Sequence, residues 1–102
     1  MPVSRNERRG HAMIVMLCRN RVVDFTKWKG VFDSHAAAHL AAGLHLRDLW
    51  QDLEDPNQIF FVLEVNSLEK ARAFISDPAA AEAGKTSGVL EGEYHFLQSS
   101  AG

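Results

Sequence analysis

The sequence predicts an α+β fold of the ferredoxin-like type, with the element order βαββαβ and helices on one face of a four-stranded antiparallel sheet. Three observations support this prediction. The 102 residues suffice for one domain with one hydrophobic core. Residues 12–18 and 59–65 are nearly continuous apolar runs of strand length. Residues 24–42 and 68–75 carry apolar side chains at helical spacing, so strand and helix alternate along the chain.

Composition excludes several classes of protein. The net charge is −2, with 46% hydrophobic and 24% charged residues, so the basic excess typical of nucleic-acid binders is missing. No apolar stretch is long enough to span a membrane. The single cysteine, Cys18, lies in an apolar run, which predicts a buried, reduced thiol and a cytoplasmic location.

The ends of the chain are expected to lie outside the domain. The arginines within residues 1–11 precede an apolar run that is too short for a signal peptide, so we expect a disordered N-terminal tail. The predicted domain spans residues 12–97, and residues 98–102 form a C-terminal tail.

The first half of the domain is expected to contain a strand, one long helix and a hairpin. Residues 24–42 form the helix, and residues 44–53 form the second strand. Asp55-Pro56-Asn57 is a turn signal that connects this strand to the third, residues 59–65.

The second half repeats the pattern. Asn66 and Glu69 have the spacing of a capping box at the start of the second long helix. Asp77-Pro78 then predicts a short extra helical turn that ends at Gly84. Residues 89–97 form the last strand.

Right-handed crossovers place the first and third strands in the centre of such a sheet. Both are apolar on both faces, whereas the other two strands include charged residues. The helices can cover only one face, so either Phe60 and Val62 or Phe61 and Leu63 need another cover. A homodimer through the sheet faces is the simplest answer.

The first helix carries the most informative side chains. At roughly 100° per residue, Phe25, Trp28, Phe32, His35 and His39 share one side of it, within roughly 80° of Phe25. The opposite side is small and polar. Both histidines therefore point into the space between helix and sheet.

Three interpretations of the two histidines remain open. They can be hydrogen-bonded core residues, which is a common outcome for buried polar groups. They can be two ligands of a metal site, which His45, Asp48 or His95 would have to complete, although no motif places those residues. They can also line a small-molecule pocket in which one histidine acts as the base.

The pocket interpretation assigns further roles. His35 or His39 is the catalytic acid–base. No metal is expected, because the pair supplies two ligands where zinc needs three or four, and no cofactor is expected, because the chain has no phosphate-binding glycine loop and no nucleotide fingerprint. Aromatic side chains are candidates for substrate contacts, although plain core packing is their commoner role. These candidates are Trp28, Phe32, Phe25, Tyr94 and Trp50.

Several segments resemble one known superfamily. They are Val23-Asp24-Phe25 with Trp28-Lys29 and Phe32-Asp33, Asp55-Pro56-Asn57, residues 67–74 (SLEKARAF) and Gly88-Val89. These residues resemble the dimeric α+β barrel superfamily, and within it the small antibiotic biosynthesis monooxygenase-like and cyclase-like proteins. The resemblance covers about residues 12–97 and implies a homodimer in which two sheets pack face to face. Members include cofactor-free oxygenases of polycyclic phenols, haem degraders, lactone isomerases and proteins with no known activity.

The sequence departs from these relatives in one respect. The phenol oxygenases and haem degraders of this superfamily typically use an Asn and a Trp, and the haem degraders also use a His for the iron. Here Trp28 is on the first helix, residues 78–83 contain no histidine, and Asn20 is expected past the end of the first strand. Haem degradation is therefore not expected.

The sequence thus predicts a small-molecule-binding dimeric α+β barrel protein. The resemblance implies a cofactor-free monooxygenase, cyclase or isomerase that acts on an aromatic or carbonyl compound. The alternative is a ligand-binding or assembly protein without catalytic activity.

Overall fold

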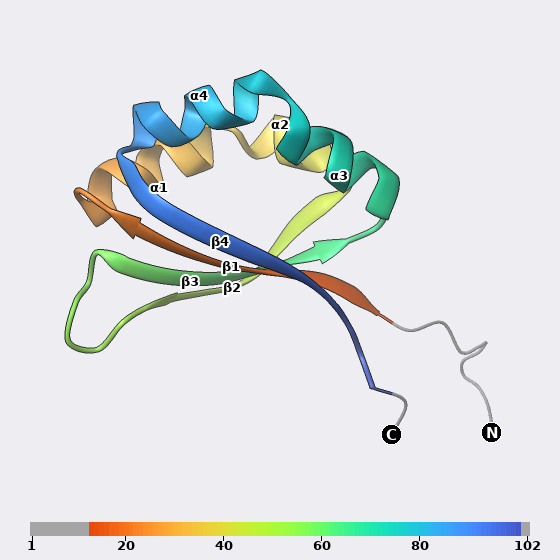
Figure 1. Cartoon of the computed structure of the whole chain (residues 1–102), viewed down its shortest axis with the longest axis horizontal. Helices are drawn as coiled ribbons and strands as arrows, with labels where there is room; N and C mark the ends of the chain where they lie inside the picture. Colours follow the sequence, from red (N-terminus) through yellow and green to blue (C-terminus); the bar gives the residue numbers. More distant parts are fainter. Residues whose placement is uncertain (1–12, 101–102) are drawn as a thin grey trace.

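The structure is a computed structural model that describes residues 13–100. Within them, helices and strands follow the predicted βαββαβ order, except that the first expected helix is a pair of helices and the short helical turn expected after the second is a full helix (Figure 1). The elements are β1 (Ile14–Val22), α1 (Phe25–Ser34), α2 (Ala36–Ala41), β2 (Leu44–Gln51), β3 (Gln58–Val65), α3 (Leu68–Ser76), α4 (Pro78–Ser87) and β4 (Val89–Gln98). The predicted α+β class is confirmed. The expected tail over residues 1–11 lies outside the described residues.

The sheet is antiparallel with the order β2-β3-β1-β4, so the predicted central position of β1 and β3 is confirmed. All four helices lie on one side of it, which leaves the other face uncovered by described residues (Figure 1). β1 is longer than predicted and continues to Val22. The prediction ended at Cys18 because charged residues follow, but Arg19 and Arg21 point to the uncovered face, where they pair with glutamates of β4.

Strand register decides which side chains face the helices. Cys18 is paired with Phe61, and Phe61 is buried under the helices, so Phe60 and Val62 lie on the uncovered face. A β-bulge between Leu46 and Asp48 shifts β2 by one residue. Trp50 then pairs with Phe60 and shares its uncovered face.

The expected single helix over residues 24–42 is two helices, and this prediction was wrong at His35. Asp24 caps α1 by accepting a hydrogen bond from Lys27 N at 2.9 Å. At His35 the backbone leaves the helical region (φ −100°, ψ 14°), and its N–H bonds to Phe32 O instead of Val31 O. Ser34 Oγ and His35 Nδ1 take over the Val31 oxygen, at 2.6 and 2.8 Å. Local side-chain hydrogen bonds of this kind compete with the helix.

The second helical segment also departs from the prediction at its caps. Ser67, rather than Asn66, caps α3 by accepting from Lys70 N at 3.2 Å. The predicted Asp77 cap of α4 is confirmed, with Asp77 Oδ1 accepting from Ala79 N at 2.9 Å. Gly84, however, lies inside α4, which ends at Gly88 with φ +84°. A left-handed residue is required only at Gly88, so only this glycine acts as the stop.

The core lies between the helices and the centre of the sheet. Leu44 and Ile59 are fully buried, and Ala71 of α3 and Trp28 of α1 complete the cluster from the helical side. None of the helices in residues 13–100 is both long enough and apolar enough to cross a membrane.

The two glycines of α4 provide a test of its C-terminus. Gly88→Ala should lower the free energy of unfolding by about 1 kcal/mol, because an alanine pays the left-handed backbone penalty there. Gly84→Ala should raise it by up to about 1 kcal/mol, because an added Cβ meets no atom within 4 Å and alanine favours the helix. Urea denaturation of both variants measures this difference. Destabilisation by Gly84→Ala would instead place the helix end at Gly84.

Candidate functional site

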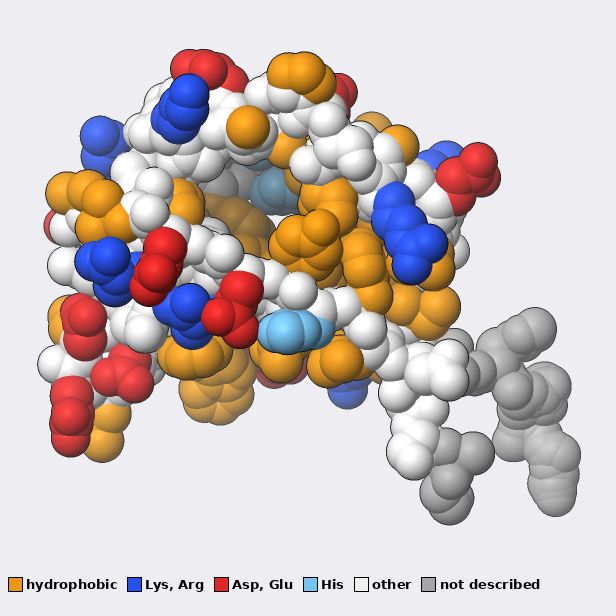
Figure 2. Space-filling view, in the orientation of Figure 1, with side chains coloured by type: hydrophobic (Ala, Val, Ile, Leu, Met, Phe, Trp, Pro, Cys, Tyr) orange, Lys and Arg blue, Asp and Glu red, His pale blue; other side chains and the backbone are white. Residues whose placement is uncertain are grey.

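A cavity of about 940 Å³ separates the helical layer from the sheet. Helices α1 and α4 pack against each other and form an arch above the strands. The space-filling view shows the molecule hollowed between this arch and β4, with a histidine visible inside (Figure 2). The volume lies in the range of small-molecule sites, roughly 300–1,000 Å³.

Each element contributes a different kind of side chain to this cavity. β1 and β3 supply an apolar floor that includes Met16, Cys18 and Phe61. The α1–α2 side carries aromatic and imidazole rings, whereas the α4 side carries small residues such as Ala80 and Ala83. The cavity thus has one ring-lined wall and one wall of alanines, which leaves room between them.

His35 stands at the break between α1 and α2, and its ring lines the cavity. Nδ1 lies 2.8 Å from Val31 O, and a carbonyl oxygen only accepts, so Nδ1 carries the proton in this contact. The neutral ring therefore presents Nε2 as a hydrogen-bond acceptor. A base needs this arrangement, because one nitrogen is fixed by the backbone while the other remains available to a substrate.

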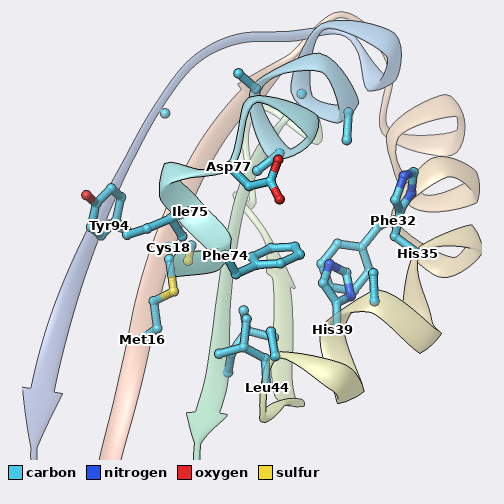
Figure 3. Close-up of a pocket in the computed structure, with 18 of the residues that line it drawn as sticks. Met16, Cys18, Phe32, His35, His39, Leu44, Phe74, Ile75, Asp77 and Tyr94 are labelled. Carbon is cyan, nitrogen blue, oxygen red and sulfur yellow. The ribbon is translucent and has the colours of Figure 1, made fainter. Parts of the chain in front are cut away.

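His39, one turn further on α2, lies among aromatic rings. Its ring centroid is 4.7 Å from that of Phe32 and 5.6 Å from that of Phe74 (Figure 3). It is half-buried and forms no ring hydrogen bond to any residue within the described part of the chain. It also borders a second, smaller cleft of about 450 Å³ beside β2.

The electrostatics of His39 favour its neutral ring. The pKa of His39 is lowered from its ordinary value, first because burial disfavours the charged ring and second because His35 lies nearby. Burial also raises the pKa of the Cys18 thiol to about 12, so the thiol on the cavity floor stays protonated and inert.

The predicted aromatic contacts divide into two groups. Phe32 and the half-exposed Tyr94 line the cavity. Trp28 also borders it but is only 2% exposed and stacks behind Phe32, with ring centroids 4.9 Å apart, so it supports the wall. Phe25 packs next to Trp28 and is not among the lining residues. Trp50 lies on the uncovered face of the sheet, away from the cavity.

Asn20 is a candidate site residue that sequence reasoning missed. It was expected past the end of the first strand, but it lies inside β1 and lines the cavity. Its Oδ1 would be 2.6 Å from a Cβ at Gly92, so a side chain at that position of β4 would force the amide of Asn20 to move. The alternation Met16, Cys18, Asn20, Val22 is the signal that places it on the helix-covered face.

The residues considered for a metal site are not brought together. Asp48 and His95 follow the register of the uncovered face, and His45 borders only the smaller cleft beside β2, which it shares with His39 but not with His35. Among the described residues, no three His, Cys, Asp or Glu side chains are grouped as metal ligands.

Comparison with known proteins identifies the fold. Neither a scan against protein-family models nor a search of curated proteins found a match to this chain. Solved structures do match it. A candidate antibiotic biosynthesis monooxygenase from Bordetella bronchiseptica has a TM-score of 0.70 at 16% identity, covering 89% of this chain and 100% of its own. The predicted resemblance in fold is confirmed.

Two further structures show how varied the proteins with this fold are. SnoaB from Streptomyces nogalater, described as a cofactor-independent oxygenase, matches with a TM-score of 0.68 at 13% identity, over 88% of this chain and 95% of its own. A NIPSNAP family protein of unknown function from Agrobacterium tumefaciens matches with a TM-score of 0.61 at 15% identity, over 87% and 89%. At these identities the likeness establishes a common fold and leaves activity open.

The lowered pKa of His39 predicts a pH-dependent stability. Below the ordinary histidine value of 6.5, the unfolded chain takes up a proton that the folded chain does not, so stability should fall as the pH drops below this value. NMR titration of the ring C–H signals measures the pKa in the native state, and His39→Gln identifies the signal by its loss. The same variant should flatten this part of the stability curve. A His39 that titrates at or above 6.5 would contradict the analysis.

Proposed function

We propose that the cavity binds a small aromatic or carbonyl compound and that His35 or His39 removes a proton from it. The observation that carries this proposal is the presence of both imidazoles in the wall of one cavity, where Nε2 of His35 and both ring nitrogens of His39 form no hydrogen bond to described residues. Oxygenation, cyclisation or isomerisation would follow on the resulting anion. The name of SnoaB supports this reaction class, because that protein is described as a cofactor-independent oxygenase.

The geometry favours His35 as the base and His39 as its neighbour. Nε2 of His35 forms a bond to the proton of a substrate O–H or acidic C–H, and the electron pair stays on the substrate as an anion. Nδ1–H remains bonded to Val31 O, so the imidazolium that forms is stabilised by a backbone dipole. The side-chain amide of Asn20 is available to donate to the developing oxyanion from the floor.

A panel of anthrone-like, quinol and lactone compounds tests the enzyme proposal. Substrate loss and oxygen uptake are followed for the wild type and for His35→Gln and His39→Gln. Removal of the acid–base should lower turnover by about 10²-fold or more. His95→Gln is the matched control, because His95 lies on the uncovered face, outside the cavity and the smaller cleft, and glutamine can still bond to Glu93.

The alternative role of the histidines gives a different result. If both variants turn over and bind the panel like the wild type while their melting temperatures fall, the histidines are packing residues. That outcome would leave a protein that binds ligands or forms assemblies without catalysis.

We further propose that the chain forms a homodimer through the uncovered face of its sheet, in the cytoplasm, where the buried Cys18 thiol stays reduced. Phe60, Val62 and Leu17 are only partly covered within one chain, and Trp50 is 63% exposed beside them. An apolar patch of this kind on a monomer is typical of an interaction surface. Arg19, paired with Glu93 at 2.9 Å, supplies a polar region on the same face.

If the chain dimerises through this face, the effect of an added charge on dimerisation should depend on where the charge is placed. Val62→Asp in the middle of this face should convert the dimer to a monomer, as measured by sedimentation velocity. Leu53→Asp introduces the same charge at a side chain that is 97% exposed in the β2–β3 connection, and it should leave the dimer intact. A wild type that sediments as a monomer would refute the proposal.

A further inference from the structure

The cavity contains a carboxylate that the proposed acid–base chemistry does not use. Asp77 lies between α3 and α4, on the wall opposite the histidines, and it lines the cavity. The close-up shows its carboxylate directed toward the side that carries Phe32, His35 and His39 (Figure 3). One oxygen, Oδ1, is fixed by the hydrogen bond from Ala79 N at 2.9 Å. The second oxygen has no protein donor among the described residues.

The charge of Asp77 is only partly compensated. The N-terminus of α4 offers it about half a positive charge, which leaves net negative potential. No lysine, arginine or histidine within residues 13–100 forms an ion pair with it. Lys70 also lines the cavity, but it lies in the first turn of α3, whereas Asp77 caps the opposite end of that helix. At 1.5 Å per residue, the two backbone positions are about 10 Å apart along the helix axis.

The other charged lining residue does not change this balance. Glu93 borders the cavity, yet its carboxylate bonds to Arg19 at 2.9 Å and to His95 at 3.2 Å, both of which lie on the uncovered face. The part of the cavity between Asp77 and the histidines is therefore anionic on one side. On the other side it presents Nε2 of His35, which accepts a hydrogen bond in the tautomer that donates from Nδ1 to Val31 O.

We propose that Asp77 selects a planar aromatic ligand that carries a positively charged nitrogen. The ring system lies along Phe32 and Phe74, and the cationic nitrogen donates to the free oxygen of Asp77. An anionic ligand of the same shape binds more weakly, because its charge would face that carboxylate, and the exposure of Asp77 to solvent keeps this difference modest. This inference rests on the proposed binding function of the cavity and adds a charge preference to it.

Two fluorescent tricyclic probes of similar size test the preference. 9-Aminoacridine carries a positive charge at pH 7, and anthracene-9-carboxylate carries a negative one. Fluorescence titration of the wild type should show that the cation binds about five- to tenfold more tightly than the anion. Asp77→Asn should remove most of this ratio by weakening the binding of the cation.

Three variants distinguish the effect of the Asp77 charge on binding from effects on folding and on the net charge of the protein. Asparagine and serine cap helices about as well as aspartate, so Asp77→Asn and Asp77→Ser should both keep α4 and both lose the preference. Glu82→Gln changes the net charge by the same amount on the same helix, outside the cavity wall, and should retain the preference.

Two results would overturn the inference, and they have different consequences. If the wild type binds both probes equally, or if Asp77→Asn retains the preference, Asp77 does not select the ligand, but the cavity still binds small molecules. If neither probe binds to the wild type, the proposed binding function fails together with the inference.

Discussion

The central strands β1 and β3 must be buried on both faces, and the described part of one chain covers only one of them. Cys18 and Phe61 pack beneath the helices, whereas Leu17, Phe60 and Val62 alternate with them and face outward. The positions of the cavity and of the exposed apolar surface follow from this division. The helical side holds the cavity, and the outer side holds the apolar surface on which the proposed dimer depends. A second copy on the outer face and a ligand beneath the helices therefore do not compete for the same residues.

The cavity exists because the helices pack on one another more than on the strands. Small side chains on α4, such as Ala80 and Ala83, do not reach the floor formed by Met16 and Cys18. Interiors are normally packed without space of this size, because an unfilled apolar volume loses both burial and dispersion energy. A helix with larger side chains could have filled it. The choice of small residues on this wall thus fits a site that something else occupies.

The alternation of strand and helix could be predicted from the sequence because periodicity and caps are local signals. The break at His35 could not, since it depends on Val31 O accepting from Ser34 and His35 at the same time. Asn20 was missed for a related reason. Charged residues on both sides of it suggested that the strand had ended, whereas those charges are paired across the sheet with β4. Asp77 was predicted only as a cap, because its place opposite the histidines depends on tertiary packing.

The state of His39 distinguishes a packing role from a functional one. A polar group removed from water without a hydrogen bond costs about 1–3 kcal/mol, which a leucine or phenylalanine at the same position would avoid. His35 offsets this cost on one nitrogen through Val31, but His39 has no such partner among the described residues. The imidazole lies between two openings, the main cavity and the cleft beside β2. Because the ring is only half-buried between these openings, water can supply its hydrogen bonds, and a ligand of the proposed kind would replace that water.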